Sequence, residues 1–140
     1  MRVKERHAAV PSDAAQLPVL TRFLQEFWSA AQLPAAEALP FELALEEVFI
    51  NVVMHGASAG TSPWVEVSLV LAEDGLTMTI EDTGPLFDPL SLPPPDITAS
   101  LTERPIGGLG VFLVRQLMDT IGYERVGMRN RLRMTKRIST

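Results

Sequence analysis

A hairpin signal in the middle of the chain constrains the fold more than any other feature. From Trp64 to Leu71 every second residue is apolar, which puts Val65, Val67, Leu69 and Leu71 on one face of a strand. Asp74-Gly75 then forms a tight-turn pair, and Leu76, Met78 and Ile80 share one face after it. Strands joined by a tight turn are antiparallel, and no helix separates them as in a parallel βαβ unit. The pattern therefore predicts a mostly antiparallel sheet.

Helical periodicity before this hairpin predicts a first helix. A cap at Ser12 or Asp13 precedes apolar residues at helical spacing that continue to Trp28. Pro18 lies inside this stretch, so either the first turn starts late or the helix is kinked there.

Two further helices are predicted, one on each side of the hairpin. The second runs from about Pro40 to His55, after a linker at residues 32–40, and is expected to end at Gly56, since glycine suits a helix C-cap. The third runs from Gly108 to about Ile121, after a proline-rich loop at residues 85–105 that is long enough to be a lid, a binding loop or a disordered segment.

The remaining segments complete a two-layer α+β sandwich. Strands are predicted at residues 2–10, 123–127 and 129–138, which gives one mostly antiparallel sheet with three helices on one face. A chain of 140 residues is the length of one domain, so residues 1–140 are expected to form a single domain.

Composition narrows the functional class. With 46% hydrophobic and 21% charged residues the chain is typical of a globular protein, and without cysteine it holds no thiolate metal site or catalytic thiol. The longest uncharged run, residues 48–65, is too polar to span a membrane, and no signal segment opens the chain, so a cytoplasmic location is expected. A net charge of −5 disfavours nucleic acid as the main partner.

The basic residues are unevenly distributed. Half of them lie in the last sixteen positions, where Arg129, Arg131 and Arg133 alternate along a predicted strand. Such an arginine face is either an ordinary solvated surface or a docking surface for an acidic partner.

The second predicted helix carries the first candidate site residues. Glu47 and Asn51 are four positions apart and share one stripe, while the apolar residues that flank them leave little of the helix for solvent. Polar groups held against an apolar surface need partners. On helical propensity alone, the two side chains could equally point outward with Glu42 and Glu46.

Two other places break the local pattern. Strand periodicity places Asp82 on the core face, where a carboxylate must accept from protein donors or from a ligand with a donor edge such as an adenine amino group. Alternatively, Asp82 begins the Thr83-Gly84 turn. The cluster Gly107-Gly108-Leu109-Gly110 opens into a helix, where free amides favour a phosphate, although many helices begin after glycine.

Taken in order, these blocks resemble the GHKL, or Bergerat-fold, ATP-binding superfamily, and within it the anti-sigma-factor serine/threonine kinases of the RsbW type. The resemblance covers nearly the whole chain. The blocks that carry it are Glu47-Val-Phe-Ile-Asn51 with His55-Gly56, Asp82-Thr-Gly84, Gly107-Gly-Leu-Gly110 and Asn130-Arg-Leu-Arg-Met-Thr-Lys136.

The resemblance implies a role for each block. Asn51 would ligate a Mg²⁺ ion that bridges the ATP phosphates, and Glu47 would be the general base. Asp82 would accept from the adenine amino group, with Gly84 giving the base room. Gly107, Gly108, Leu109 and Gly110 would bring backbone amides to the phosphates. We therefore expect the acid that ends the hairpin and the amide of the second helix to line one cavity shaped for a purine triphosphate.

The chain departs from the superfamily pattern at two points. Leu86 follows Pro85 where many members have a second glycine, which predicts a stiffer lid hinge. Arg129-Asn130 stands where many relatives carry Gly-Thr, and Asn130 could replace that threonine near the adenine.

The implied activity is phosphoryl transfer from Mg-ATP to a serine or threonine of an anti-sigma-factor antagonist of the STAS type. A sigma factor would be the competing partner, and relatives dimerise, so a homodimer is possible. One alternative keeps the fold but not the chemistry, as a catalytically weak or inactive module whose partner affinity is gated by nucleotide. Another is an unrelated α+β protein in which the three breaks are caps and turns.

Overall fold

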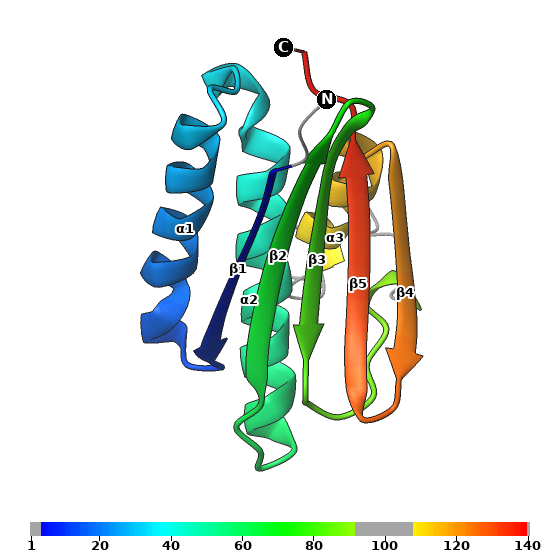
Figure 1. The fold of residues 1–140 in the computed structure, drawn as a ribbon. Coiled ribbons are helices and arrows are strands. Elements are labelled where there is room, and N and C mark those ends of the chain that lie inside the picture. The colour runs from blue at the N-terminus through cyan, green and yellow to red at the C-terminus, as the bar shows by residue number, and fades with distance from the viewer. Residues whose placement is uncertain (1–3, 92–107, 140) are drawn as a thin grey trace.

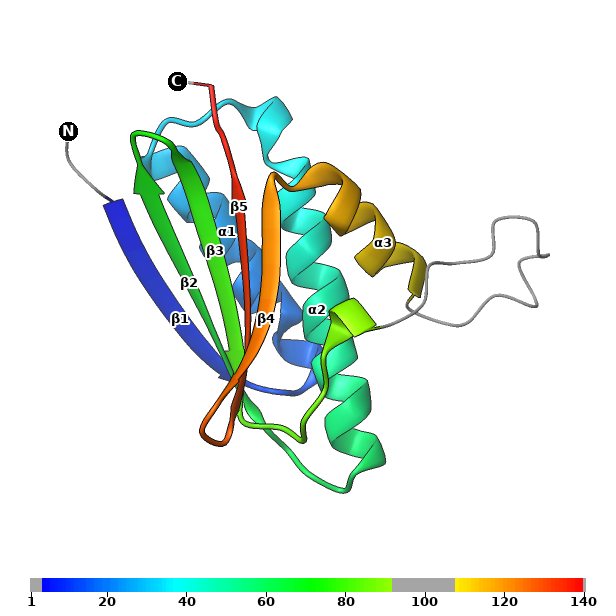
Figure 2. The ribbon, with the colours of Figure 1, turned by 90° about the vertical axis from the view of Figure 1, so that its right-hand side faces the viewer.

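The computed structural model describes residues 4–91 and 108–139, apart from the side chains of Gly108 and Leu109. These residues form one five-stranded sheet in the order β1-β2-β3-β5-β4, with every neighbouring pair antiparallel. Figures 1 and 2 show the helices α1, α2 and α3 on one face of this sheet. The predicted two-layer α+β architecture is therefore confirmed.

All five predicted strands are present. Their bounds are β1 (Lys4–Pro11), β2 (Trp64–Ala72), β3 (Gly75–Asp82), β4 (Thr120–Val126) and β5 (Arg129–Lys136). The β2–β3 hairpin closes at Gly75, whose φ of 144° is open to glycine and strained for other residues. A Cβ at Gly75 would also lie 2.6 Å from the backbone oxygen of Lys136. Gly75, which helped to predict the hairpin, is thus also needed for the packing of the turn against the end of β5.

The first helix begins late, as one of the two interpretations of Pro18 required. Asp13 accepts a hydrogen bond from the Ala15 amide and caps a short 3-10 turn, η1 (Ala14–Gln16). The α-helix α1 (Leu17–Ala30) follows, with Pro18 in its first turn, where the missing N–H costs nothing.

The other two helices differ in length from their predicted spans. Helix α2 (Leu39–Ser58), preceded by the short η2 (Ala35–Glu37), continues through Gly56, so the predicted C-cap role of this glycine is wrong. A Cβ at Gly56 would lie 2.6 Å from the Pro63 side chain, so the glycine is needed for the packing of the following loop. Helix α3 (Gly108–Leu117) ends before the predicted Ile121, because the chain from Thr120 onward pairs with β5 as an edge strand.

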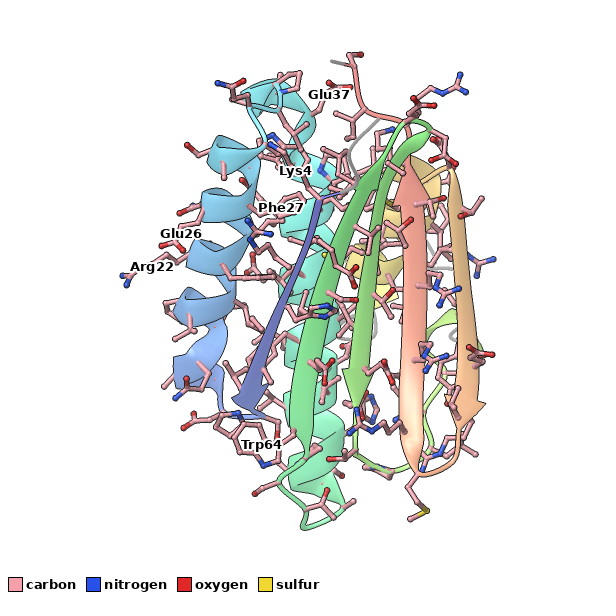
Figure 3. All side chains as sticks on the ribbon, in the orientation of Figure 1. Lys4, Arg22, Glu26, Phe27, Glu37 and Trp64 are labelled. Atoms are coloured by element: carbon pink, nitrogen blue, oxygen red, sulfur yellow. The ribbon has the colours of Figure 1, made fainter. Side chains whose placement is uncertain are left out.

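The hydrophobic core lies between the sheet and the helices. Along β2 and β3 every second residue is buried and the residues between them are half-buried or exposed, as the strand pattern predicts. On α1, Phe27 lies between helix and sheet, whereas Arg22 points away from it (Figure 3). Helix α2 packs against both α1 and α3, so it forms the centre of the helical layer.

Candidate functional site

Three of the predicted site residues, one each from α2, β3 and β5, meet in one place. A cavity of about 20 Å³ is lined by Asn51 of α2, Asp82 at the end of β3 and Asn130 of β5, together with apolar and aromatic side chains. Strand register explains part of this, since Asp82 and Asn130 are directly paired. The three residues are the buried polar side chains among those the structure describes, with 7%, 8% and 5% exposure respectively. The interpretation in which Asn51 points outward is therefore wrong.

The amide nitrogen of Asn51 lacks a partner in the described part of the chain. Its Nδ2 atom is buried and has no hydrogen-bond partner among the described residues. An unsatisfied buried donor costs about 1–3 kcal/mol, so a group that completes the hydrogen bonding of this amide would be stabilising. The amide oxygen is a hard donor of the kind that Mg²⁺ accepts.

Glu47 lies one helical turn before Asn51 and is half-buried, whereas Glu42 and Glu46 are exposed. Burial raises the pKa of the Glu47 carboxyl above its ordinary value, and the neighbouring charge of Glu46 raises it further. A carboxylate with a raised pKa is a stronger proton acceptor than a solvated one. The surroundings of Glu47 thus increase its affinity for a proton.

Gly110 brings the start of α3 against Glu47. A Cβ at Gly110 would overlap the Cγ, Cδ and Oε2 atoms of Glu47, so the carboxylate lies directly over the glycine backbone. Gly108 and Leu109 form the first residues of α3, and Gly107 lies outside the described residues. Only a glycine at position 110 allows Glu47 and the α3 N-terminus to approach this closely.

Replacing Gly110 with alanine should therefore displace Glu47 without unfolding the protein. The overlapping atoms belong to the end of a flexible side chain, and alanine is favoured over glycine in a helix by about 1 kcal/mol. If Glu47 is the base, a displacement of this size lowers the rate of phosphate transfer by about 100-fold. Gly122→Ala is the matched control, because a Cβ at Gly122 meets nothing within 4 Å. Equal transfer rates for the two variants would contradict the role of this contact.

The structure supports both interpretations of Asp82, as an acceptor on the core face and as the residue that begins the Thr83-Gly84 turn. Its side chain is turned inward, and its Oδ1 atom accepts hydrogen bonds from the Gly84 amide at 2.9 Å and from Asn130 Nδ2 at 3.0 Å. Burial raises the pKa of the Asp82 carboxyl, while these hydrogen bonds and the charge of Arg125 act in the opposite direction. A Cβ at Gly84 would lie 2.9 Å from Asp82 Oδ1, so the turn is closed by glycine for steric reasons.

Two residues of β4 belong to the site and were missed from the sequence. The hydroxyl of Tyr123 donates to Asn130 Oδ1 at 2.5 Å, and Arg125 Nη1 donates to the same atom at 3.1 Å and to the Gly84 oxygen at 3.0 Å. Their period-two spacing placed both on one face of a strand. That signal became informative only once the register of β4 against β5 was known.

The segment after β3 covers the cavity. Residues 83–91, which include the short η3 (Pro89–Ser91), run between β4 and α2 (Figure 2), and Phe87 and Pro89 line the cavity. The ring of Phe87 stacks on His55 of α2 with centroids 3.7 Å apart. The rest of the predicted loop at 85–105, from residue 92, lies outside the described residues.

The size of the cavity corrects one expectation. A volume of about 20 Å³ holds a water molecule, whereas ligand pockets usually measure about 300–1,000 Å³. The acid and the amide line one cavity as expected, but it is not shaped for a purine triphosphate in this conformation. A nucleotide can enter only if Phe87 and its neighbours move.

The arginine face of β5 is largely neutralised within the sheet. Arg129 lies 3.8 Å from Glu66, and Arg131 forms ion pairs with Glu81 at 3.5 Å and Glu124 at 3.0 Å. Of the three predicted docking arginines, Arg133 alone forms no ion pair with the described residues. The structure therefore favours the interpretation of this arginine face as an ordinary solvated surface over its interpretation as a docking surface for an acidic partner.

The described residues contain neither a cluster of metal-binding side chains nor a helix that could cross a membrane. In the described part of the chain, no cluster of three or more histidine, cysteine or acidic side chains could hold a metal by itself. Mg²⁺ is usually bound through one or two protein oxygens and the phosphates of its substrate, so Asn51 fits that ion without a larger cluster. Within residues 4–91 and 108–139, no helix combines the length and the apolar character that crossing a membrane requires.

Comparison with known proteins places this geometry in context. A family model described as a histidine kinase-like ATPase domain matches residues 10–136. The serine/threonine-protein kinase BtrW of Bordetella bronchiseptica is 29% identical over 114 residues, which cover 80% of this chain and 75% of BtrW. The serine-protein kinase RsbW of Listeria monocytogenes is 30% identical over 84 residues, or 57% of this chain and 54% of that protein. The RsbW match thus spans about half of the relative.

A solved structure supports the fold. The crystal structure of the RsbU and RsbW domains of Rv1364c from Mycobacterium tuberculosis aligns with a TM-score of 0.70 at 15% identity. The alignment covers 98% of this chain and 33% of the mycobacterial chain. At this identity the match supports the arrangement of helices and strands, and the chemistry must be argued from the site.

Proposed function

This chain belongs to the histidine kinase-like ATPase domain family, and from that premise we propose that it is an ATP-dependent serine/threonine protein kinase that acts as an anti-sigma factor. Its protein substrate would be an anti-sigma-factor antagonist of the STAS type, and a sigma factor would compete for the same kinase. The names of the relatives support the kinase activity. The cytoplasmic setting and the homodimer expected from the sequence are parts of this proposal.

The observation that carries the proposal is the placement of Glu47 and Asn51. They lie one turn apart on α2. Glu47 lies against Gly110 at the start of α3, and Asn51 lines the cavity that holds Asp82. Asn51 would ligate Mg²⁺, which neutralises phosphate charge when bound. Glu47 would accept the proton of the attacking serine or threonine hydroxyl, because its raised pKa suits a base. A protein that only binds nucleotide would not need a base at this place.

The remaining site residues would hold the nucleotide. Asp82 would accept from the adenine amino group, with Gly84 and Asn130 beside it. The amides that begin α3, at Gly108, Leu109 and Gly110, would face the phosphates together with Gly107, since a helix N-terminus favours anions. Phosphoryl transfer needs positioning and charge neutralisation more than covalent chemistry, and these groups provide both.

Two measurements test this function. We expect Mg-ATP to raise the melting temperature, because a ligand at 100 times its Kd stabilises by about 2.7 kcal/mol. We also expect radiolabelled phosphate from ATP to appear on a serine or threonine of one candidate antagonist protein mixed with the kinase. The absence of any thermal shift with Mg-ATP would contradict both nucleotide binding and transfer.

The nucleotide-gated binding module remains the second candidate, because one observation favours gating. Phe87 must leave its stack on His55 before a nucleotide can enter, so binding and rearrangement of residues 83–91 are coupled. In that case Mg-ATP would change the affinity for a partner protein, and no phosphate would be transferred to it.

A further inference from the structure

The side-chain amide of Asn130 is fixed in one orientation by its surroundings. Its Oδ1 atom faces three donors, namely the Phe87 amide at 3.3 Å, the Tyr123 hydroxyl at 2.5 Å and Arg125 Nη1 at 3.1 Å. Its Nδ2 atom donates to two acceptors, Asp82 Oδ1 at 3.0 Å and the Pro85 oxygen at 2.8 Å. Rotation of the amide by half a turn would set donors against donors and acceptors against acceptors.

This orientation determines which part of Asp82 is left for a ligand. Oδ1 already accepts from Gly84 and Asn130, which uses both of its lone pairs. None of the hydrogen bonds that the described residues donate to Asp82 ends on Oδ2. Because Asp82 lines the cavity, Oδ2 is the oxygen that remains to accept a hydrogen bond there.

The same network favours the ionised form of Asp82. The pKa of the carboxyl is raised overall by burial, and the Asn130 donor, the Gly84 amide and the positive charge of Arg125 each limit that rise. Other titratable groups nearby are Tyr123 on β4 and Asp88 in the segment that covers the cavity. An ionised carboxylate only accepts hydrogen bonds, whereas a protonated one can also donate.

We propose that Tyr123 and Arg125 are positioning residues that act through Asn130 to present Asp82 as an acceptor only, and thereby select adenine over guanine nucleotides. Adenine carries an amino donor at the position where guanine carries an oxygen acceptor. Guanine would set that oxygen against the carboxylate, and a buried acceptor without a donor is costly. This inference rests on the proposed function, because it assumes that the cavity opens to a nucleotide.

The test compares ATP and GTP binding by isothermal titration calorimetry in the presence of Mg²⁺. We expect the parent protein to bind ATP at least about 100-fold more tightly than GTP. Arg125→Met and Tyr123→Phe each remove donors to Asn130 Oδ1 while keeping much of the side-chain volume. In both variants ATP affinity should fall by about tenfold and the ATP-to-GTP ratio should fall with it.

Two further variants serve as controls. Arg133→Met changes an exposed arginine that forms no ion pair with the described residues, and both affinities should stay at the parent values. Arg125→Lys keeps the positive charge and should recover part of the ATP preference. If Tyr123 and Arg125 had only a general structural role, their loss would weaken ATP and GTP binding equally, which would overturn the proposal.

The pH dependence of ATP binding adds a readout that a structural role would not change. ATP affinity should fall at acidic pH as Asp82 becomes protonated. The midpoint should move to higher pH in Arg125→Met, because the pKa of Asp82 rises when this charge is removed. An unmoved midpoint would contradict the role of Arg125.

The failure of this inference is distinguishable from that of the proposed function. A parent protein that binds neither nucleotide would overturn both. A parent protein that binds ATP and GTP equally well would overturn the selection of adenine by Asp82 and leave the kinase assignment standing.

Discussion

Glu47→Gln should abolish phosphate transfer while leaving nucleotide binding nearly intact. Glutamine has the size of glutamate, so the packing of residue 47 over Gly110 is preserved. What is lost is a proton acceptor, and a general base contributes about 10²–10⁴-fold to the rate of the step it assists. The nucleotide contacts proposed for Asn51 and Asp82 do not involve Glu47, so the thermal shift with Mg-ATP should persist.

The matched control for Glu47→Gln is Glu46→Gln. Glu46 is the exposed neighbour on the same helix, and its removal takes away a nearby negative charge that raises the pKa of Glu47. Without that charge Glu47 ionises more readily and stays available as a base, so transfer by Glu46→Gln should remain close to the parent rate. Transfer by Glu47→Gln at that same rate would exclude Glu47 as the base. A parent protein that binds Mg-ATP but phosphorylates no partner would favour the nucleotide-gated module.

The pH dependence of transfer follows from the same carboxyl. A base acts in its deprotonated form, so the rate should rise with pH as Glu47 ionises. Because burial and Glu46 raise the pKa of Glu47, the rise should be centred above the ordinary range of a glutamate. Steady-state transfer rates in a series of buffers test this, and a rate independent of pH across the acidic range would contradict it.

The sequence predicted the parts of this protein that depend on local periodicity. Alternation along residues 64–82 is local, so it correctly placed the hairpin and the inward side chain of Asp82. The four-residue spacing of Glu47 and Asn51 likewise identified two polar groups that lie on the same side of a mostly buried helix. In each case one element with a strong repeat determined the answer.

Contacts between distant segments were beyond such patterns. The overlap between Glu47 and a Cβ at Gly110 depends on how α2 and α3 pack, which no single helix encodes. Tyr123 and Arg125 reach Asn130 only because β4 pairs with β5 in one particular register. The small volume of the cavity depends on how residues 83–91 pack over it. The length of this segment alone does not predict whether it closes the cavity or leaves it open.

Helix ends were misplaced for a related reason. Gly56 is a plausible cap by residue type, but α2 continues to Ser58, and the glycine instead leaves room for Pro63 to pack against the helix. The end of α3 was extended too far because Ile121 continues its apolar pattern, whereas hydrogen bonding to β5 takes this residue into β4. Tertiary pairing thus outweighed local propensity at both ends.

Asp82→Asn should weaken nucleotide binding and at the same time leave the free protein at least as stable at neutral pH. An asparagine oxygen can still accept from Gly84 and Asn130, so the turn and the β3–β5 register are retained. The variant loses the charged acceptor proposed for the adenine amino group. A hydrogen bond to a charged group contributes about 1.5–3 kcal/mol, which corresponds to about 10- to 150-fold in affinity.

The stability effect of Asp82→Asn has a definite sign. Burial raises the pKa of Asp82 in the folded state, so the parent protein is favoured at pH values below the unfolded pKa and loses that stability as the pH rises through the folded pKa. Asparagine never ionises, and the melting temperature of the variant relative to the parent should therefore increase from acidic to neutral pH. Thermal denaturation at several pH values, with and without Mg-ATP, measures both effects.

The control for this experiment is Asp74→Asn, which changes an exposed aspartate in the β2–β3 turn, away from the cavity. It should retain the Mg-ATP shift and show no comparable gain in stability between acidic and neutral pH. A full Mg-ATP shift in Asp82→Asn would exclude Asp82 as the adenine acceptor. A variant that is less stable than the parent at neutral pH would instead show that the charge on Asp82 stabilises the turn more than its burial destabilises the fold.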